Sequence, residues 1–319
     1  MLYNIYFMGN SSKRFQLITK YKDIIERLPF VNEKGEKKHM NNFICPLCLK
    51  TYQFLDPDNN ITIEHVPPEK LGGKPLLLTC KDCNSICGYN LDIYLINEVR
   101  NSYVLRHLDK KRHKAKLQIE DVCINADATI IGNSDIFFNI DEQKNNPKSY
   151  NALNKYLATY DSIYRINATI KLSEQKTNTK KAAIAILKSA YLLAFYYLGY
   201  RYILHSNLDP IRKQILYPDN DLFGGKYILS NERHLPAELT DGIYLISLNS
   251  ISLYGVILSF KAQKQDYTHR SLVALPHPED KDSSLFIKEI TEIEKATPTI
   301  SIKARLTAKE FGKTLDNNK

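Results

Sequence analysis

The chain has 319 residues, with 44 lysines and arginines against 35 acidic residues and a formal net charge of +9 at pH 7. This length allows two or three domains and a substantial core, which argues against a small scaffold held by disulfides. Its 6 cysteines and the lack of an apolar leader at the N-terminus indicate a reducing, cytoplasmic setting, where clustered cysteines more often hold metal. The positive charge favours a partner with a phosphate backbone, although basic surfaces also occur on other proteins.

Residues 1–40 predict an N-terminal α/β segment. The apolar stretch LYNIYF is typical of a strand, and a helix is expected over residues 19–28. The polar stretch NEKGEKKH then predicts a loop that leads into the next module.

Two cysteine pairs of two-residue spacing follow, Cys45 with Cys48 and Cys80 with Cys83. Each pair can place two thiolates at adjacent corners of a tetrahedron around zinc, with Zn–S distances of about 2.3 Å. Since tetrahedral zinc has four positions, we expect Cys87 to be a small buried residue of the following helix. The cysteines alone are also compatible with a zinc ribbon that has no catalytic role.

The segment between the pairs predicts two strands and a helix within residues 41–108. The strands are expected near residues 51–65, turned at DPDNN, whose Asp, Pro and Asn residues favour turns. The helix is expected to run from the second cysteine pair to about Leu108.

The motifs EHVPP, LGG and LTCKDCN resemble the HNH nuclease family in its cysteine-bearing form, over roughly residues 41–100. The resemblance implies the ββα-metal finger fold. It also implies that His65 is the general base and that Glu64 and Asn84 bind a catalytic divalent cation. The middle Asn of the family pattern is absent, and Pro75 stands in its place, which puts the loop geometry in doubt more than the chemistry. The residues that carry the resemblance are Glu64, His65, Pro67, Gly72, Gly73, Cys80, Cys83 and Asn84.

The same residues suit phosphodiester hydrolysis on chemical grounds. Water attack on a phosphodiester needs a base with a pKa near 7, which histidine supplies, and a hard cation that neutralises charge on the phosphate oxygens. A carboxylate and an amide oxygen suit Mg²⁺ or Mn²⁺, whereas four thiolates select Zn²⁺. Neighbours on an extended segment point to opposite faces, so Glu64 and His65 are not expected to compete for one ion.

A basic run, RHLDKKRHKAK, follows the predicted helix. It is predicted to bind the phosphates that flank the cut site, by Coulomb attraction and counterion release. A solvated helix end or loop is the alternative interpretation. The basic residues are Arg106, Lys110, Lys111, Arg112, Lys114 and Lys116.

Residues 109–319 predict an α+β accessory region for substrate or partner binding. ATIIGNSDIFFNI and YDSIYRINATIKL indicate strands, separated by the polar stretch EQKNNPKSYNALNKY, and residues 226–303 are β-rich. Residues 180–204 predict a core helix rather than a membrane span, because Lys188 would lie near the middle of the bilayer. Asp209-Pro210 predicts the start of a second helix.

The sequence therefore predicts an α+β protein that cuts nucleic acid, with DNA as the expected substrate, and that has no membrane segment. A defence or restriction nuclease, acting against phage, and a mobile-element nuclease are the two settings that fit. The accessory region would supply specificity, a protein partner or a homo-oligomer contact. The alternative is a zinc-containing module that binds nucleic acid without cutting it.

Overall fold

The computed structural model describes most of the chain and divides it into two compact units. Unit 1 comprises Met1–Ile96 and Asn178–Lys319, and unit 2 comprises Asn97–Thr177. This division differs from the boundaries predicted at residues 40 and 108, since the C-terminal part packs with the cysteine-bearing part. The described residues are 10–26, 30–31, 37–38, 42–54, 60–105, 112–131, 135–159, 168–172, 177–231, 234–248, 251–262, 267–277, 286–288 and 300–306.

Both units combine helices with antiparallel sheets, which confirms the predicted α+β class. In the N-terminal part of unit 1, the described helix α1 begins well before the predicted residue 19, and the predicted strand at LYNIYF lies outside the described residues. The elements there are α1 (Asn10–Glu26), β1 (Phe30–Val31), β2 (Lys37–Lys38), β3 (Asn42–Ile44), β4 (Thr51–Gln53), β5 (Ile61–Val66), the 3₁₀ turn η1 (Glu69–Leu71), β6 (Lys74–Cys80) and α2 (Lys81–Cys87).

The strand pairing around the cysteines differs from the prediction of one pair over residues 51–65. Strand β4 pairs with β3, and β5 pairs with β6, in two separate antiparallel hairpins. The prediction was wrong because it took DPDNN as the turn of a hairpin, whereas LGG makes the turn that returns the chain. Gly72 has φ +84°, a conformation that glycine adopts without strain. We call β5, β6 and α2 the hairpin–helix module.

The helix after the second cysteine pair continues through a π-helical turn. Its parts are α2, the π turn Gly88–Asp92 and α3 (Ile93–Leu105), so Gly88 does not end it. The predicted end at Leu108 lies just outside the described residues.

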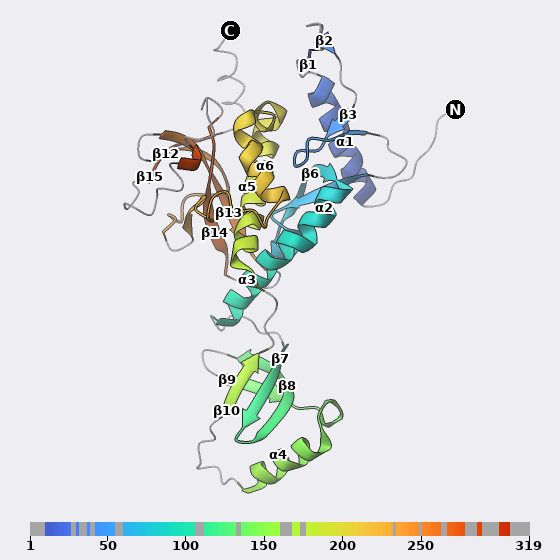
Figure 1. Ribbon diagram of the computed structural model, residues 1–319, viewed down its shortest axis with the longest axis vertical. Coiled ribbons are helices and arrows are strands. Elements are labelled where there is room, and N and C mark those ends of the chain that lie inside the picture. Colours follow the sequence, from blue (N-terminus) through green and yellow to red (C-terminus); the bar gives the residue numbers. More distant parts are fainter. Residues whose placement is uncertain are drawn as a thin grey trace, which may run out of the picture. The chain divides into compact units, whose positions relative to one another are not determined.

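Helix α5 (Thr179–Ile203) is the core of unit 1 and lies between the five-stranded sheet and the hairpin–helix module (Figure 1). It is the helix among the described residues that is long and apolar enough to cross a membrane, yet 72% of its most apolar stretch is buried inside the protein. This burial agrees with the predicted core helix. The short helix α6 (Asp209–Leu216) follows and has Pro210 in its first turn, as predicted.

The sheet beside α5 has the strand order β11-β14-β13-β12-β15 and is antiparallel throughout. Its strands agree closely with the β-rich region predicted over residues 226–303. The end of β13 also contacts the module, because the backbone N–H of Lys261 donates to the carbonyl of Leu71, at 2.9 Å. The strands are β11 (Ile228–Asn231), β12 (Gly242–Leu248), β13 (Ile251–Phe260), β14 (His269–Leu275) and β15 (Ile300–Arg305).

Unit 2 is a four-stranded antiparallel sheet with one helix packed on one face (Figure 1). Leu153 of the helix packs against Leu117, Ile119 and Ile124 of the sheet. The helix was missed in the sequence because EQKNNPKSYNALNKY was interpreted as a polar connection, although its apolar residues recur at helical spacing. The strand order is β10-β7-β8-β9, and the elements are β7 (Arg112–Ile119), β8 (Val122–Ile131), β9 (Asp135–Asn139), α4 (Pro147–Thr159) and β10 (Ala168–Leu172).

Candidate metal centre and catalytic site

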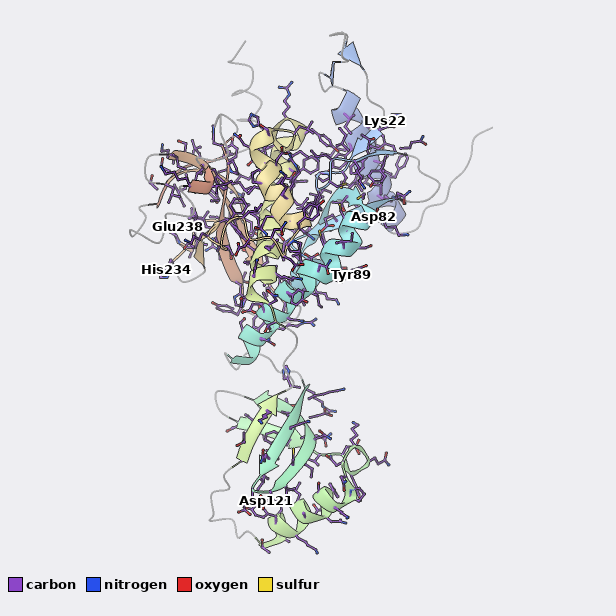
Figure 2. The ribbon with its side chains drawn as sticks, in the orientation of Figure 1. Lys22, Asp82, Tyr89, Asp121, His234 and Glu238 are labelled. Atoms are coloured by element: carbon purple, nitrogen blue, oxygen red, sulfur yellow. The ribbon has the colours of Figure 1, made fainter. Side chains whose placement is uncertain are left out.

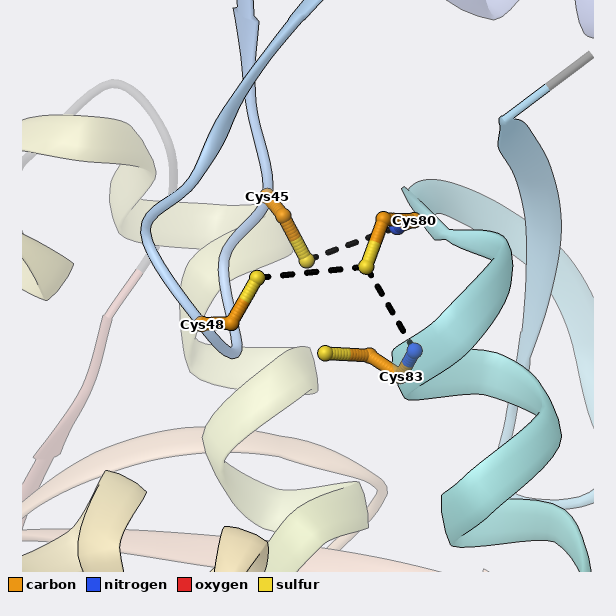
Figure 3. Close-up of side chains that lie close together, drawn as sticks. All are labelled: Cys45, Cys48, Cys80 and Cys83. Atoms are coloured by element: carbon orange, nitrogen blue, oxygen red, sulfur yellow. Dashed lines mark hydrogen bonds between the residues drawn. The ribbon is translucent and has the colours of Figure 1, made fainter. Parts of the chain in front are cut away.

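The four paired cysteines form one cluster (Figure 3). Cys45 and Cys48 lie in the tight turn between β3 and β4, closed by hydrogen bonds between Cys45 and the backbone of Leu49 and Lys50, each 2.9 Å. Cys80 is the last residue of β6, and its sulfur caps α2 by accepting from the backbone N–H of Cys83, at 3.4 Å. The turn of one hairpin and the strand–helix junction of the other thus present their sulfurs to one point.

The spacing of the sulfurs fits a tetrahedral metal ion. All four Sγ atoms lie within 4.8 Å of one another, and those of Cys48 and Cys80 are 3.8 Å apart. A tetrahedron with Zn–S bonds of about 2.3 Å has edges of about 3.8 Å. The predicted grouping of these four cysteines is confirmed, and the donor set suits structural zinc.

The electrostatics of the cluster also favour a cation. Burial raises the pKa of the Cys45 thiol, whereas the hydrogen bond with Cys45 lowers the pKa of Cys48 to about 7. Several thiolates in so small a space repel one another, and a bound dication offsets that repulsion.

The other two cysteines lie outside the cluster. Cys87 is 1% exposed in the last turn of α2, which confirms the prediction of a small buried helix residue. Cys123 is exposed on β8 of unit 2.

His65 lies on β5 and is half-buried. No hydrogen bond joins its imidazole to a described residue. Pro75 is its register partner on β6, and a β-bulge separates this pair from the pair of Glu64 with Leu77. The proline that replaces the middle Asn of the family pattern therefore lies directly opposite the predicted base, and it has no N–H with which to continue the ladder.

The loop after His65 is held by close backbone packing. A Cβ atom on Gly73 would lie 1.5 Å from the carbonyl oxygen of Pro67, so only glycine fits there. The backbone N–H groups of Leu71 and Gly73 both donate to the carbonyl of Pro68, at 2.8 and 3.3 Å. The EHVPP and LGG motifs thus act together to close the loop beside His65.

Glu64 is 3% exposed, in contrast to the half-buried His65 beside it. Its Oε1 atom lies 2.9 Å from Nζ of Lys188 on α5, and its Oε2 atom accepts a hydrogen bond from Thr79 Oγ1 at 3.2 Å. Both carboxylate oxygens of Glu64 are thus engaged inside the protein. A metal-ligand role for Glu64 requires release of Lys188.

Lys188 also contacts Asp92, the last residue of the π turn, with 2.7 Å between Nζ and Oδ2. We call Glu64, Asp92 and Lys188 the ion cluster. Burial alone lowers the pKa of Lys188, but the two carboxylates outweigh it and raise that pKa, so the ammonium stays charged. Burial raises the pKa of Asp92 to about 6, and Lys188 opposes the rise.

Asn84 ties α2 to the strand that carries His65. Its Nδ2 atom donates to the carbonyl of Ile63 and to Thr62 Oγ1, each at 2.9 Å. These contacts fix the orientation of the amide, because its nitrogen faces the strand. Among the described residues, none donates a hydrogen bond to its oxygen. That oxygen is the hard donor that the predicted role requires.

The sequence did not identify the ion cluster. Asp92 contacts Lys188, which lies 96 residues further along the chain. The one available signal was Lys188 itself, because a lysine within an apolar helix needs a buried acidic partner.

The predicted nucleic-acid-binding run lies only partly within the described structure. Arg106, Lys110 and Lys111 fall outside the described residues, while Arg112 and Lys114 are exposed on β7 of unit 2. This segment is a strand, so the alternative of a helix end or loop does not hold for residues 112–119.

Comparisons of the chain with protein-family models, with curated proteins and with solved structures found no match. What the fold and the site define is an α+β protein with a cysteine cluster suited to a structural metal ion.

Proposed function

We propose that the chain is a metal-dependent endonuclease of the HNH type that hydrolyses nucleic acid, with DNA as the expected substrate. In this proposal the hairpin–helix module is a ββα-metal finger, and zinc bound at the cysteine cluster stabilises it. The observation that carries the proposal is the pair of hydrogen bonds from Asn84 to Thr62 and Ile63 of β5, the strand that also carries His65. They orient the amide of Asn84 against the strand that carries the imidazole of His65.

His65 is the general base. It is the histidine of the hairpin–helix module, it is half-exposed, and no described side chain occupies its nitrogens. A general base needs one ring nitrogen that can reach water, and this exposure allows it. The packed loop of Pro67 and Gly73 limits the movement of the strand end that carries it.

Asn84 Oδ1 is a ligand of a divalent cation, Mg²⁺ or Mn²⁺. When bound, that cation neutralises charge that builds on the phosphate and leaving-group oxygens. Glu64, the second predicted ligand, has a different part in the arrangement observed. Its contacts with Lys188 and Thr79 fix β5 from the inside, so it positions His65 without touching the substrate.

A zinc-containing module that binds nucleic acid without cutting it is the second candidate. One observation favours it: the only carboxylate predicted as a ligand for the catalytic cation is committed to Lys188. Under this alternative His65 is a surface residue, and the cysteine cluster alone explains the module.

Cleavage assays separate the two candidates. The full chain, loaded with zinc, is incubated with supercoiled plasmid, single-stranded DNA and RNA, with Mg²⁺ or Mn²⁺ and with EDTA. The proposal predicts cleavage of DNA that needs the added cation. His234→Ala is the matched control, since His234 is an exposed histidine of unit 1, outside the hairpin–helix module (Figure 2). Binding without cleavage under every condition would favour the second candidate.

A further inference from the structure

The sheet of unit 2 buries one face and leaves the other uncovered. Side chains alternate along β7 between buried and exposed, and the buried set packs on α4. The opposite face carries the exposed set, and it is hollowed, with a cavity of about 670 Å³ lined by residues of all four strands. Asp121 in Figure 2 marks the turn between β7 and β8.

The strand register places lysines side by side across the uncovered face. Lys171 on β10 is the register partner of Lys116 on β7. Lys114 pairs with Asp127 on β8, and Asp127 pairs in turn with Asn139 on β9. Side chains from all four strands therefore meet in one surface, with lysines on β10 and β7 and an Asp and an Asn on β8 and β9. We call this surface the lysine face.

The three lysines of this surface are available to a ligand. The described structure shows no ion pair for Lys114, Lys116 or Lys171, whereas Lys144 at the edge of the hollow is paired with Asp141 at 3.2 Å. Unpaired ammonium groups on adjacent strands repel one another, and bound phosphates remove that repulsion. The charge pattern thus fits a chain of phosphates better than a neutral partner.

Phe137 adds an aromatic ring to the same face. It is 60% exposed on β9, two residues before Asn139, and alternate residues of a strand share a face. An exposed aromatic ring beside lysines is the arrangement on which unpaired bases stack while the cations hold the backbone. A base within a duplex cannot reach such a ring without leaving its stack.

We propose that the lysine face binds single-stranded nucleic acid, with phosphates on Lys114, Lys116 and Lys171 and a base stacked on Phe137. Asp127 and Asn139 offer an acceptor and an amide to the polar edge of a base in the hollow. This inference rests on the proposed nuclease function, because it names single-stranded nucleic acid as the form that the protein binds. It goes beyond the predicted basic run, which included neither Lys171 nor any aromatic contact.

The test is the affinity of the full, zinc-loaded chain for a fluorescent 20-nucleotide single strand, measured by fluorescence anisotropy without added Mg²⁺. Phe137→Ala is expected to weaken binding about 5- to 150-fold, the range for one stacked base. Lys116→Glu with Lys171→Glu is expected to lower the slope of log affinity against log salt by about 1.4, for two lost contacts.

The double variant Lys148→Glu with Lys155→Glu is the matched control, because it alters the net charge by the same amount but on the exposed side of α4. Equal losses in the two double variants would overturn the inference, since net charge alone would then explain binding. An unchanged affinity for Phe137→Ala would overturn it as well, and so would a duplex that binds as tightly as the single strand. Failure to cut DNA contradicts only the nuclease proposal, because binding is measured without cleavage.

Discussion

The cysteine cluster and the ion cluster fix the same hairpin–helix module to different parts of unit 1. The cysteines join it to the β3–β4 hairpin, a near neighbour in the sequence, with four soft donors around one point. The ion cluster joins it to α5, where Lys188 lies 96 residues from Asp92 in the chain. The first anchor needs a metal ion to neutralise its donors, whereas the second supplies its own cation.

This difference shows what each anchor can do for the site. The cysteine cluster, with a metal ion bound, would hold the turn of Cys45 and Cys48 against the start of α2, the helix that carries Asn84. A buried ion pair holds β5, the strand that carries His65, from its inner side. The side chains of Asn84 and His65 are therefore positioned by independent means, and separate substitutions can disturb them one at a time.

Removal of the cysteine anchor is expected to have the largest effect. Structural zinc contributes apparent free energies of about 10–16 kcal/mol in zinc-finger peptides. Cys80→Ser should therefore abolish zinc binding and unfold the hairpins around the cluster, as judged by metal analysis and thermal unfolding. Cys123→Ser, at an exposed cysteine of unit 2, should change neither. A well-folded wild-type preparation that contains no zinc would contradict this prediction.

Removal of the Lys188 ammonium should lower the free energy of unfolding by less than loss of the zinc site does. Lys188→Met leaves Glu64 and Asp92 buried without a cation, and loss of one member of a buried ion pair costs about 3–5 kcal/mol. The free energy of unfolding in urea measures this cost. The control is Lys180→Met on the same helix, whose pair with Asp221 is exposed and contributes less than about 1 kcal/mol.

Equal losses for Lys188→Met and Lys180→Met would show that the ion cluster is not an anchor. The triple variant with Glu64→Gln and Asp92→Asn sharpens the comparison, since it removes all the charge from the cluster. It should recover much of the stability lost by Lys188→Met.

A smaller effect is expected at the contact that links α5 to the cysteine turn. The hydroxyl of Tyr191 donates to the carbonyl of Pro46 at 2.6 Å, inside the protein. Tyr191→Phe should lower the free energy of unfolding by about 0.5–1.5 kcal/mol, the net value of a typical hydrogen bond. Tyr196→Phe, at a tyrosine of the same helix that is 38% exposed, is the control and should change little. Equal changes in both variants would assign the effect to the helix in general.

Local features of the sequence predicted much of the fold. The cysteine spacing predicted the cluster, because the two cysteines of each pair lie close together in the chain and can bind one ion. The apolar run around Leu187 predicted the buried helix, and alternating runs predicted the strands of the five-stranded sheet. The helix α4 was missed because its apolar stripe is set among Asn and Lys residues that favour loops.

Long-range contacts could not be predicted in the same way. The partner of Glu64 comes from a helix more than 100 residues further along the chain, and no spacing rule connects them. The pairing of β5 with β6 depended on the conformation of Gly72 and Gly73, where only the tight backbone packing decides which turn forms. The contacts of Glu64 are therefore the part of the site that the sequence could least predict.

The most direct measurement is the single-turnover rate of plasmid cleavage across a Mg²⁺ titration, for wild type, His65→Ala, Asn84→Ala and Glu64→Gln. His65→Ala should bind DNA and zinc normally but cut about 10² to 10⁴ times more slowly at every Mg²⁺ concentration. Asn84→Ala should recover activity as Mg²⁺ rises, whereas Glu64→Gln should lose stability without a changed Mg²⁺ requirement. Cleavage by His65→Ala at the wild-type rate would contradict the assignment of the site as a nuclease centre.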